Sequence, residues 1–383
     1  MDFSIPEELE TIRRSVREFV ENEVFPREEI IEEEDRIPEE LIEGARQLGL
    51  FGTSIPEQYG GLGLNMVGKC IVGQELGRGH AGFSGYLGAH TGIGTSGLVM
   101  AGSGAIKEKY LPAMAEGKKI GAFALTEPGA GSDAAALKTS AVKKGDRWIL
   151  NGVKHFITNG PIADVVTTMA VTDPSRGARG ISAFVVEKEF PGFKVGKIEK
   201  KMGLRGSHTS EIIFEDCEVP EENLLGKENE GFITALKILA SGRAGLGARC
   251  VGACQRLIEL SLRYAKERAQ FGKPIIANQA IQWMLADMVT ETEAARALTL
   301  QTAWKVDRGA DIIRDAAMTK LFATEVLGRV ADRAVQIHGG MGYMKELPIE
   351  RIYRDARITR IYEGTSEVQR MVIAGQLMKK GYN

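Results

Sequence analysis

The sequence predicts an α+β protein whose helices and strands occupy separate stretches of a 383-residue chain. Apolar residues recur at helical spacing up to about residue 120, short turn-bounded apolar segments follow to 227, and long helical patterns run from 228 to the end. The length exceeds what one hydrophobic core usually supports. We therefore expect an N-terminal helical domain (1–120), a middle antiparallel β domain (121–227) and a C-terminal helical bundle (228–383).

The first segment has the pattern of amphipathic helices. Its first apolar positions, spaced by three or four residues between charged ones, are Leu9, Ile12, Val16, Phe19, Val20 and Val24. Helical patterning breaks at the turn-rich residues 55–61 and resumes to about Gly117. This predicts a helical domain.

The middle segment changes to short strands bounded by Gly, Pro and Asp. The predicted strands include 121–125, 148–150, 164–171, 181–187 and 211–214. Residues 139–150 predict a hairpin around Lys144, Gly145 and Asp146, because glycine tolerates the positive φ of a tight turn. The middle domain is therefore expected to be all-β and antiparallel.

Helical patterns return after Gly226. Their apolar positions form three groups, which are Ile258, Leu262 and Ala265, then Ile281, Leu285, Met288 and Val289, then Ala316, Leu321 and Val326. A final helix is expected after Ser366, which has the form of a capping box with Gln369. The mixed charges of residues 351–360 predict a salt-bridged surface.

Composition excludes several classes of protein. The chain has 49 Lys and Arg against 51 Asp and Glu, so no positive field exists to attract nucleic acid. The four cysteines are too few for a disulfide framework, and the neighbours Cys250 and Cys254 offer only two metal ligands. We expect buried, reduced cysteines, no metal and a structural role for His155. No secretory signal or membrane-spanning stretch is recognised, so the expected location is the cytoplasm and no membrane partner is expected.

Residues 129–134 fit the G-x-G-x-x-G/A dinucleotide fingerprint, which would indicate a nicotinamide-dependent enzyme. That fingerprint needs a helix after the glycines and an acidic residue about twenty positions later. A predicted hairpin and Asn151 occupy those places, so we reject this function. Residues 126–132 form either a ligand-facing turn with free N–H groups and hydroxyls or an ordinary surface turn.

Two further features keep two interpretations each. Glu363 is either an acidic residue favoured by a helix N-terminus or a general base among apolar neighbours. Gly339 and Gly340 either end a helix or let a ligand approach the backbone. Composition alone does not decide between these interpretations.

Five motifs, taken together and in this order, resemble the acyl-CoA dehydrogenase family. They are 123–133 (FALTEPGAGSD), 154–160 (KHFITNG), 268–272 (RAQFG), 336–340 (QIHGG) and 362–366 (YEGTS). The resemblance spans the chain and implies a helical domain, a β-barrel domain and a helical bundle, in agreement with the segmentation above. The glutamate in the last motif is similar to that of short- and medium-chain members.

The resemblance implies FAD bound between the middle and C-terminal domains. The implied FAD-binding residues of the middle domain are Phe123, Leu125, Thr126, Gly131, Ser132, Phe156, Ile157 and Thr158. Those of the C-terminal domain are Arg268, Phe271, Gln279, Gln336, Gly339, Gly340, Thr365 and Glu367. Arg268, Gln279, Gln336 and Gly340 would contact the FAD of a neighbouring subunit, which implies a homotetramer. Phe156 stands where many members carry tryptophan and still supplies an aromatic face.

By the same resemblance, Glu363 removes the α-proton of an acyl-CoA while FAD accepts the β-hydride, which yields a trans-2-enoyl-CoA. The implied substrate-binding residues are Ser132, Arg243, Tyr362 and Gly364. Gly242 corresponds to the position where branched-chain and some long-chain members place their base, so Glu363 has no rival there. Ala240 replaces an aspartate that many members carry, which weakens the transfer of CoA contacts.

An electron-transferring flavoprotein is the implied electron acceptor. A flavin oxidase of the same fold is disfavoured, because nitroalkane-oxidizing relatives carry aspartate at the base position. A non-catalytic, DNA-associated member of the family is disfavoured by the net charge of -2.

Overall fold

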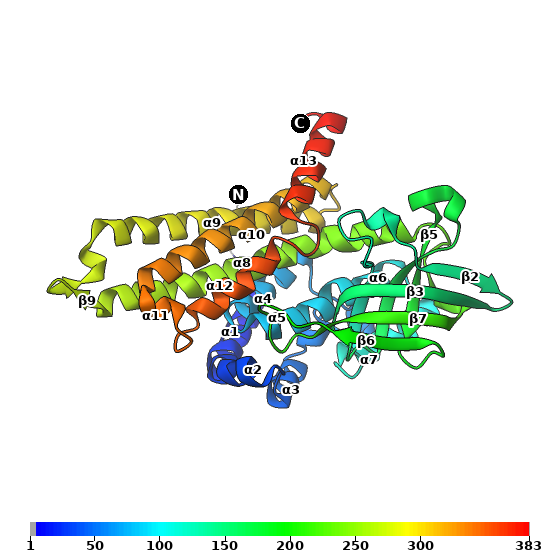
Figure 1. The fold of residues 1–383 in the computed structure, drawn as a ribbon, viewed down its shortest axis with the longest axis horizontal. Coiled ribbons are helices and arrows are strands. Elements are labelled where there is room, and N and C mark those ends of the chain that lie inside the picture. The colour runs from blue at the N-terminus through cyan, green and yellow to red at the C-terminus, as the bar shows by residue number, and fades with distance from the viewer. Residues whose placement is uncertain (1–4, 383) are drawn as a thin grey trace. The chain divides into compact units, whose positions relative to one another are not determined.

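The computed structural model of the protein describes residues 5–382. They form two compact units, and each unit combines segments that are distant in sequence. Figure 1 labels the elements and colours the chain by residue number. Within the described residues, unit 1 consists of 5–29, 66–84 and 243–382, and unit 2 of 30–65 and 85–242. The units cut across the three predicted domains, whose boundaries stay a prediction.

The order of elements along the described chain is helical, then β, then helical. The α-helices are α1 (Glu7–Phe19), α2 (Glu28–Glu34), α3 (Glu39–Gln47), α4 (Met66–Arg78), α5 (Ala81–Gly88), α6 (Thr95–Ala101), α7 (Gly104–Ala115), α8 (Gly231–Glu267), α9 (Gln279–Asp307), α10 (Ile313–His338), α11 (Gly340–Tyr343), α12 (Ile349–Thr359) and α13 (Ser366–Lys380). The strands are β1 (Gly121–Ala124), β2 (Ser140–Lys144), β3 (Arg147–Thr158), β4 (Val165–Val171), β5 (Ile181–Glu187), β6 (Phe193–Ile198), β7 (Thr209–Pro220), β8 (Leu224–Leu225), β9 (Ala269–Gln270) and β10 (Lys273–Pro274). This confirms the predicted α+β order.

Unit 2 is built on an eight-stranded sheet with the hydrogen-bonded order β6-β7-β3-β2-β4-β5-β8 and with β1 beside β4. The predicted hairpin is confirmed, since Lys144 pairs with Arg147 and Gly145 between them has a φ of 63°. The expectation of a wholly antiparallel domain is corrected, because β1 and β2 both pair with β4 in parallel. The two-residue β8 and the largely exposed β6 were not among the predicted strands.

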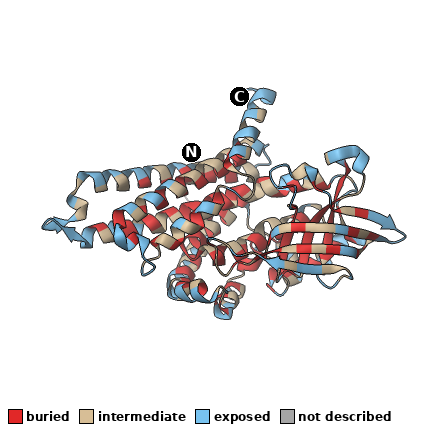
Figure 2. Ribbon diagram, viewed as in Figure 1, coloured by how far each residue is buried: buried red, intermediate tan, exposed pale blue. Residues whose placement is uncertain are grey.

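Alternation along β4 and β5 divides the core of unit 2 between the two faces of the sheet. Met169 and Val185 pack with Tyr110 of α7 on one face. Val166 and Phe184 belong to a separate cluster on the other face. Both strands are therefore buried along nearly their whole length. By contrast, β6 is mostly exposed (Figure 2).

The sheet curves strongly without closing. The rings of Trp148 in β3 and Phe184 in β5 are 5.4 Å apart, although β2 and β4 lie between these strands. Strands three places apart in a flat sheet would be separated by about 14 Å, so the sheet bends around this cluster. In the described residues the hydrogen-bonded path ends at β6 and β8. The expected barrel is thus corrected to a curved, open sheet.

Unit 1 contains a helical bundle, as predicted. Leu257 of α8, Met288 of α9, Val330 of α10 and Ala356 of α12 belong to one buried cluster. The four cysteines are buried free thiols, which confirms that expectation. Among the described residues, no helix combines the length and apolarity needed to cross a bilayer.

The charged residues of 351–360 lie in α12, except Arg360, which follows it, and they are not simply a salt-bridged surface. Arg351 and Asp355 are buried, and Arg351 Nη2 lies 2.9 Å from Glu28 Oε2. Arg354 makes a predicted type of ion pair, with Glu350 four residues earlier. The prediction failed for Arg351 because charge alternation does not reveal which face of a helix packs against a neighbour.

Candidate active site

Glu363 lies in a turn between α12 and α13, termed the base turn (residues 360–366). Glu363 has a φ of 54° and Gly364 a φ of 91°. This φ favours glycine, and a Cβ at Gly364 would also lie 2.7 Å from Gln369 Nε2, so the Gln369 side chain would have to shift. Left-handed backbone at a non-glycine residue costs about 1–2 kcal/mol, and surrounding contacts must hold it.

The start of α13 differs from the prediction. The N-cap is Thr365, whose hydroxyl accepts a hydrogen bond from the Val368 N–H at 3.2 Å. Ser366 is the first helical residue, and its hydroxyl donates to Glu325 Oε1 at 2.6 Å. The predicted capping box is therefore wrong, because the preceding threonine takes the capping position.

Two fully buried side chains donate to the carbonyl oxygen of Gly364. Lys320 Nζ lies 2.7 Å from it and Gln369 Nε2 lies 2.9 Å from it. Gln369 Nε2 also donates to the Glu363 carbonyl at 3.3 Å. The carbonyl groups of Glu363 and Gly364 are therefore both tied to α13, and that of Gly364 is also tied to α10.

Glu325 of α10 binds the two ends of the base turn. Besides the Ser366 hydroxyl, its carboxylate accepts a hydrogen bond from Arg360 Nη1 at 3.2 Å. The backbone N–H of Ser366 donates to the Arg360 carbonyl at 3.0 Å. These contacts close the turn into a compact loop that presents Glu363.

The carboxylate of Glu363 lies near two buried cations but keeps one oxygen unpaired. Its Oε2 is buried without a hydrogen-bond partner among the described residues, and so is Nε of Arg243, which is 7% exposed. Burial lowers the pKa of Arg243, and the charge of Glu363 acts in the opposite direction. Burial likewise lowers the pKa of Lys320 to about 8 against the attraction of Glu363. Because buried polar atoms are nearly always paired, these unpaired atoms are suited to a ligand.

A second candidate element is the glycine turn after β1 in unit 2, termed the glycine turn (residues 127–131). The Glu127 carboxylate accepts hydrogen bonds from the backbone N–H groups of Lys138 at 2.6 Å and Thr139 at 2.9 Å. It also accepts one from Lys154 Nζ at 2.8 Å. Lys154 is fully buried, and burial lowers its pKa to about 8 against the attraction of Glu127. A buried ion pair thus anchors the turn.

The backbone of the glycine turn is open. A Cβ added at Gly129 or Gly131 would meet no atom within 4 Å, so a ligand could approach both residues. Only the three-residue 3-10 segment Ala134–Ala136 follows before β2. This supports the rejection of the dinucleotide fingerprint, which requires a helix at that place.

A bulge in β3 presents Phe156 to solvent. The pairing register with β7 shifts between Lys154 and Ile157, and Phe156 has a φ of 57° and is 60% exposed. The His155 ring stacks on the Phe156 ring at 3.9 Å, and its Nε2 lies 3.1 Å from Glu199 Oε1.

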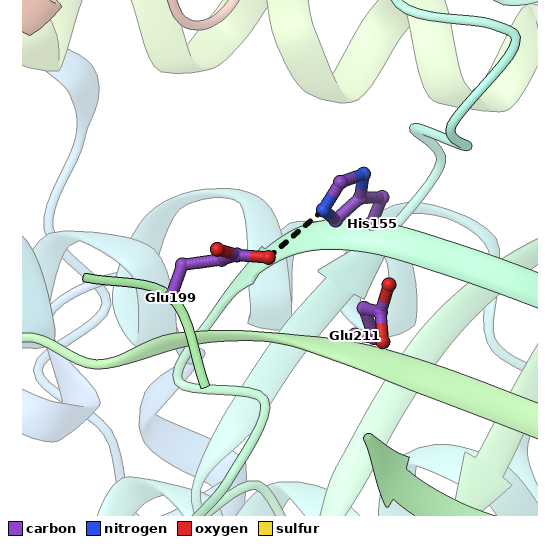
Figure 3. Close-up of side chains that lie close together, drawn as sticks. All are labelled: His155, Glu199 and Glu211. Carbon is purple, nitrogen blue, oxygen red and sulfur yellow. Dashed lines mark hydrogen bonds and ion pairs between the residues drawn. The ribbon is translucent and has the colours of Figure 1, made fainter. Parts of the chain in front are cut away.

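His155, Glu199 and Glu211 offer possible metal-ligand atoms within 4.8 Å of one another (Figure 3). The other oxygen of Glu199 already binds Lys197 Nζ at 2.7 Å. We therefore interpret the His155–Glu199 pair as a contact that orients His155 and, through stacking, Phe156.

The structure brings the implied FAD residues of unit 2 together, but not all of their side chains are accessible. His155 N–H donates to the Thr126 carbonyl at 2.8 Å, so the glycine turn and the β3 bulge are neighbours. Gly131, Ser132 and Phe156 are exposed, and Thr126 and Thr158 are half-buried. Three of the implied contacts have core side chains and could offer only backbone groups, namely Phe123, Leu125 and Ile157.

The implied FAD residues of unit 1 fall into two groups. Thr365 lies in the base turn, which Lys320 contacts, and Glu367 follows it in the first turn of α13. Arg268, Phe271, Gln279, Gln336, Gly339 and Gly340 are exposed and lie near the distant end of the bundle. There Tyr264 of α8 stacks on His338 of α10 at 4.4 Å. Lys320 and His338 are about 27 Å apart along α10 at 1.5 Å per residue, so the two groups are well separated.

Sequence reasoning missed Lys320 and Glu325, and it gave no role to Glu127 and Lys154, although both lie in the quoted motifs. One signal was available for Lys320, because it lies three or four residues from the buried Ala316 and Ala323 and hence on the apolar face of its helix. A lysine on such a face is almost always paired. Gln369 was noticed, but its predicted role as a capping residue is wrong.

Comparison with known proteins shows the family. Three acyl-CoA dehydrogenase domains match: the N-terminal domain over residues 6–118, the middle domain over 122–217 and the C-terminal domain over 229–378. An acyl-CoA dehydrogenase of Bacillus subtilis is 47% identical and aligns over 98% of this chain and 99% of its own. An acryloyl-CoA reductase (NADH) of Anaerotignum propionicum is 46% identical and aligns over 99% of this chain and 97% of its own. The caffeyl-CoA reductase–Etf complex subunit CarC of Acetobacterium woodii is 45% identical and aligns over 98% of this chain and 99% of its own.

Two solved structures extend the comparison. Butyryl-CoA dehydrogenase of Megasphaera elsdenii superposes with a TM-score of 0.95 at 41% identity, covering 99% of this chain and 100% of that chain. An acyl-CoA dehydrogenase of Bacillus anthracis in complex with FAD gives a TM-score of 0.92 at 39% identity, covering 99% of this chain and 68% of that chain. The matches cover the helical, β and helical segments together, and the chain therefore belongs to the acyl-CoA dehydrogenase family.

Proposed function

We propose that this chain is an FAD-dependent acyl-CoA dehydrogenase in which Glu363 removes the α-proton of the acyl thioester. The observation that carries the proposal is the carboxylate of Glu363, which keeps a buried, unpaired oxygen beside Arg243 on a turn fixed by several hydrogen bonds. A general base needs a free lone pair and a fixed position. The alternative role as a helix-terminus acid requires neither.

The residues fit FAD. The open backbone of Gly129 and Gly131 and the hydroxyls of Thr126, Ser132 and Thr158 suit phosphate and ring contacts, and exposed Phe156 supplies an aromatic face. When bound, FAD supplies the acceptor for the β-hydride. The separation of Arg268 and Gln336 from the base turn supports contacts with the FAD of a neighbouring subunit in a homotetramer.

The substrate class follows from the base. An α-proton beside a thioester is removable only if donors meet the charge that develops on the carbonyl oxygen in a dry site. Arg243, Tyr362 and Gly364 are the substrate-binding residues that we propose for unit 1, and Ser132 for unit 2. The preferred acyl group is proposed to be a short or medium chain, and an electron-transferring flavoprotein is the proposed electron acceptor, supported by the complex named for the CarC relative.

The decisive test is anaerobic mixing with acyl-CoAs from C4 to C16. We expect the absorbance of the bound oxidised flavin to bleach with at least one saturated acyl-CoA. No bleaching with any of them, straight or branched, would contradict the proposal.

A second candidate function is the reverse reaction, reduction of a 2-enoyl-CoA, because two of the relatives reported above are named as CoA-ester reductases. The same residues would serve, with Glu363 returning the α-proton. Anaerobic addition of a 2-enoyl-CoA to chemically reduced enzyme measures this direction. The rate and extent of flavin reoxidation by the 2-enoyl-CoA are compared with the rate and extent of flavin bleaching by the matching acyl-CoA. This comparison decides between reduction and dehydrogenation.

Substitution Arg268→Ala tests the proposed cofactor contact across subunits. A guanidinium can bind a pyrophosphate through two hydrogen bonds, and Arg268 is exposed in this chain, so its loss should leave the fold intact and lower FAD retention. FAD content after gel filtration and mass by light scattering measure the effect. Full flavin content at unchanged tetramer mass would remove this role.

A further inference from the structure

Lys320 is a fully buried lysine that lacks a carboxylate within salt-bridge distance in the described residues. Its ammonium group donates to the Gly364 carbonyl at 2.7 Å, and Glu363 is the largest favourable charge acting on it. Burying an ammonium costs several kcal/mol even after the protein relaxes. Such a cost requires a compensating role, and its contacts place that role at the base turn.

The geometry of the base turn shows what the contact controls. Glu363 occupies a left-handed conformation that few non-glycine residues adopt. Lys320 and Gln369 converge on the Gly364 carbonyl, and Gln369 also holds the Glu363 carbonyl. These bonds fix the orientation of both peptide groups, and therefore the direction in which the Glu363 side chain leaves the backbone.

We propose that Lys320 and Gln369 are positioning residues that hold Glu363 in its reactive conformation, a proposal that rests on the function of Glu363 as base. Neither side chain needs to touch the substrate. Loss of either donor lets the turn relax toward ordinary backbone angles and moves the carboxylate from the α-proton. A displacement of 1 Å can cost about 10²-fold in rate.

The test compares Lys320→Met and Gln369→Leu, which remove the donors with little change in volume. At equal FAD content, we expect the anaerobic rate constant of flavin reduction at saturating acyl-CoA to fall by about 10²-fold, with the dissociation constant of acyl-CoA close to the wild-type value. Lys320→Arg, which keeps a cationic donor, should recover part of the rate. Lys345 is exposed, so Lys345→Met is the matched control, and its flavin should be reduced at the wild-type rate.

Combination with Glu363→Gln separates positioning from general structural damage. If Lys320 acts through Glu363, Lys320→Met causes no further loss of rate in the Glu363→Gln background. A further loss of rate in the Glu363→Gln background, or a wild-type rate in both Lys320→Met and Gln369→Leu, would overturn the positioning role. Neither result would affect the role of Glu363 as base. If Lys320→Met fails to retain FAD, the same comparisons with Gln369→Leu decide. A wild-type rate in Glu363→Gln would overturn both the role of Glu363 as base and the positioning role of Lys320 and Gln369.

Discussion

Substitution Glu363→Gln is expected to lower turnover by about 10² to 10⁴-fold, the range of a general base. The amide keeps the shape of the side chain but has no basic oxygen for proton abstraction. The contacts that fix the base turn involve backbone carbonyls of residues 363 and 364 and do not use the carboxylate. FAD content and acyl-CoA binding should therefore stay near wild-type values.

The measurement is single-turnover flavin reduction by a good acyl-CoA, with spectral titration of binding in the same preparation. Glu346→Gln is the matched control, because Glu346 is exposed and makes no ion pair in the described part of the chain. Equal loss in both variants would indicate a nonspecific effect. Near-normal reduction in fully flavinated Glu363→Gln would exclude Glu363 from the mechanism.

The predictable parts of this fold are those with strong local patterns. The helices of the bundle and the strands β4 and β5 carry clear apolar periodicity, and the β2–β3 hairpin has glycine where φ is positive. The curvature of the sheet was not predictable, because contacts such as Trp148 with Phe184 depend on how distant strands are ordered. The parallel pairing of β1 with β4 is likewise a result of topology rather than of either segment's composition.

The residues of the candidate site also divide into those that the sequence identifies and those that only the packed structure reveals. Glu363 was identified through the resemblance of its motif, whereas its own sequence context left two roles open. Lys320 lies 43 residues earlier in the chain than Glu363 and contacts the turn only because α10 packs against it. The left-handed conformation of Glu363 has no sequence signal beyond the glycine that follows it. Long-range polar contacts of this kind require the packed structure.

The buried pair of Glu127 and Lys154 is expected to give the largest effect on stability in unit 2. Removing one partner of a buried ion pair typically costs about 3–5 kcal/mol, because a buried charge remains unpaired. Glu127→Gln leaves the Lys154 ammonium fully buried without its counter-charge. The double variant Glu127→Gln with Lys154→Met removes that charge, so it should be more stable than Glu127→Gln alone.

The sign of the pH dependence gives an independent check. Burial already lowers the pKa of Lys154 to about 8 in the folded protein, against its ordinary value of 10.5. Without Glu127, the pKa of Lys154 in the folded protein falls further. Between that lower pKa and pH 8, Lys154 of the Glu127→Gln variant is protonated in the unfolded state but neutral in the folded state. The stability of Glu127→Gln then rises with pH while the Lys154 contribution of the wild type is constant. The deficit of the variant should therefore shrink as pH approaches 8.

Urea unfolding followed by Trp148 emission measures both effects. Trp148 is buried in unit 2, whereas Trp283 and Trp304 are exposed in unit 1 and can be replaced by phenylalanine to leave a single reporter. We compare unfolding midpoints of the wild type, both single variants and the double variant in that background at pH 6.5 and 8. Because Glu127 and Lys154 are in contact, their effects should be less than additive. Additive losses, or a deficit of Glu127→Gln that is the same at both pH values, would show that the lysine is not a buried charge held by Glu127.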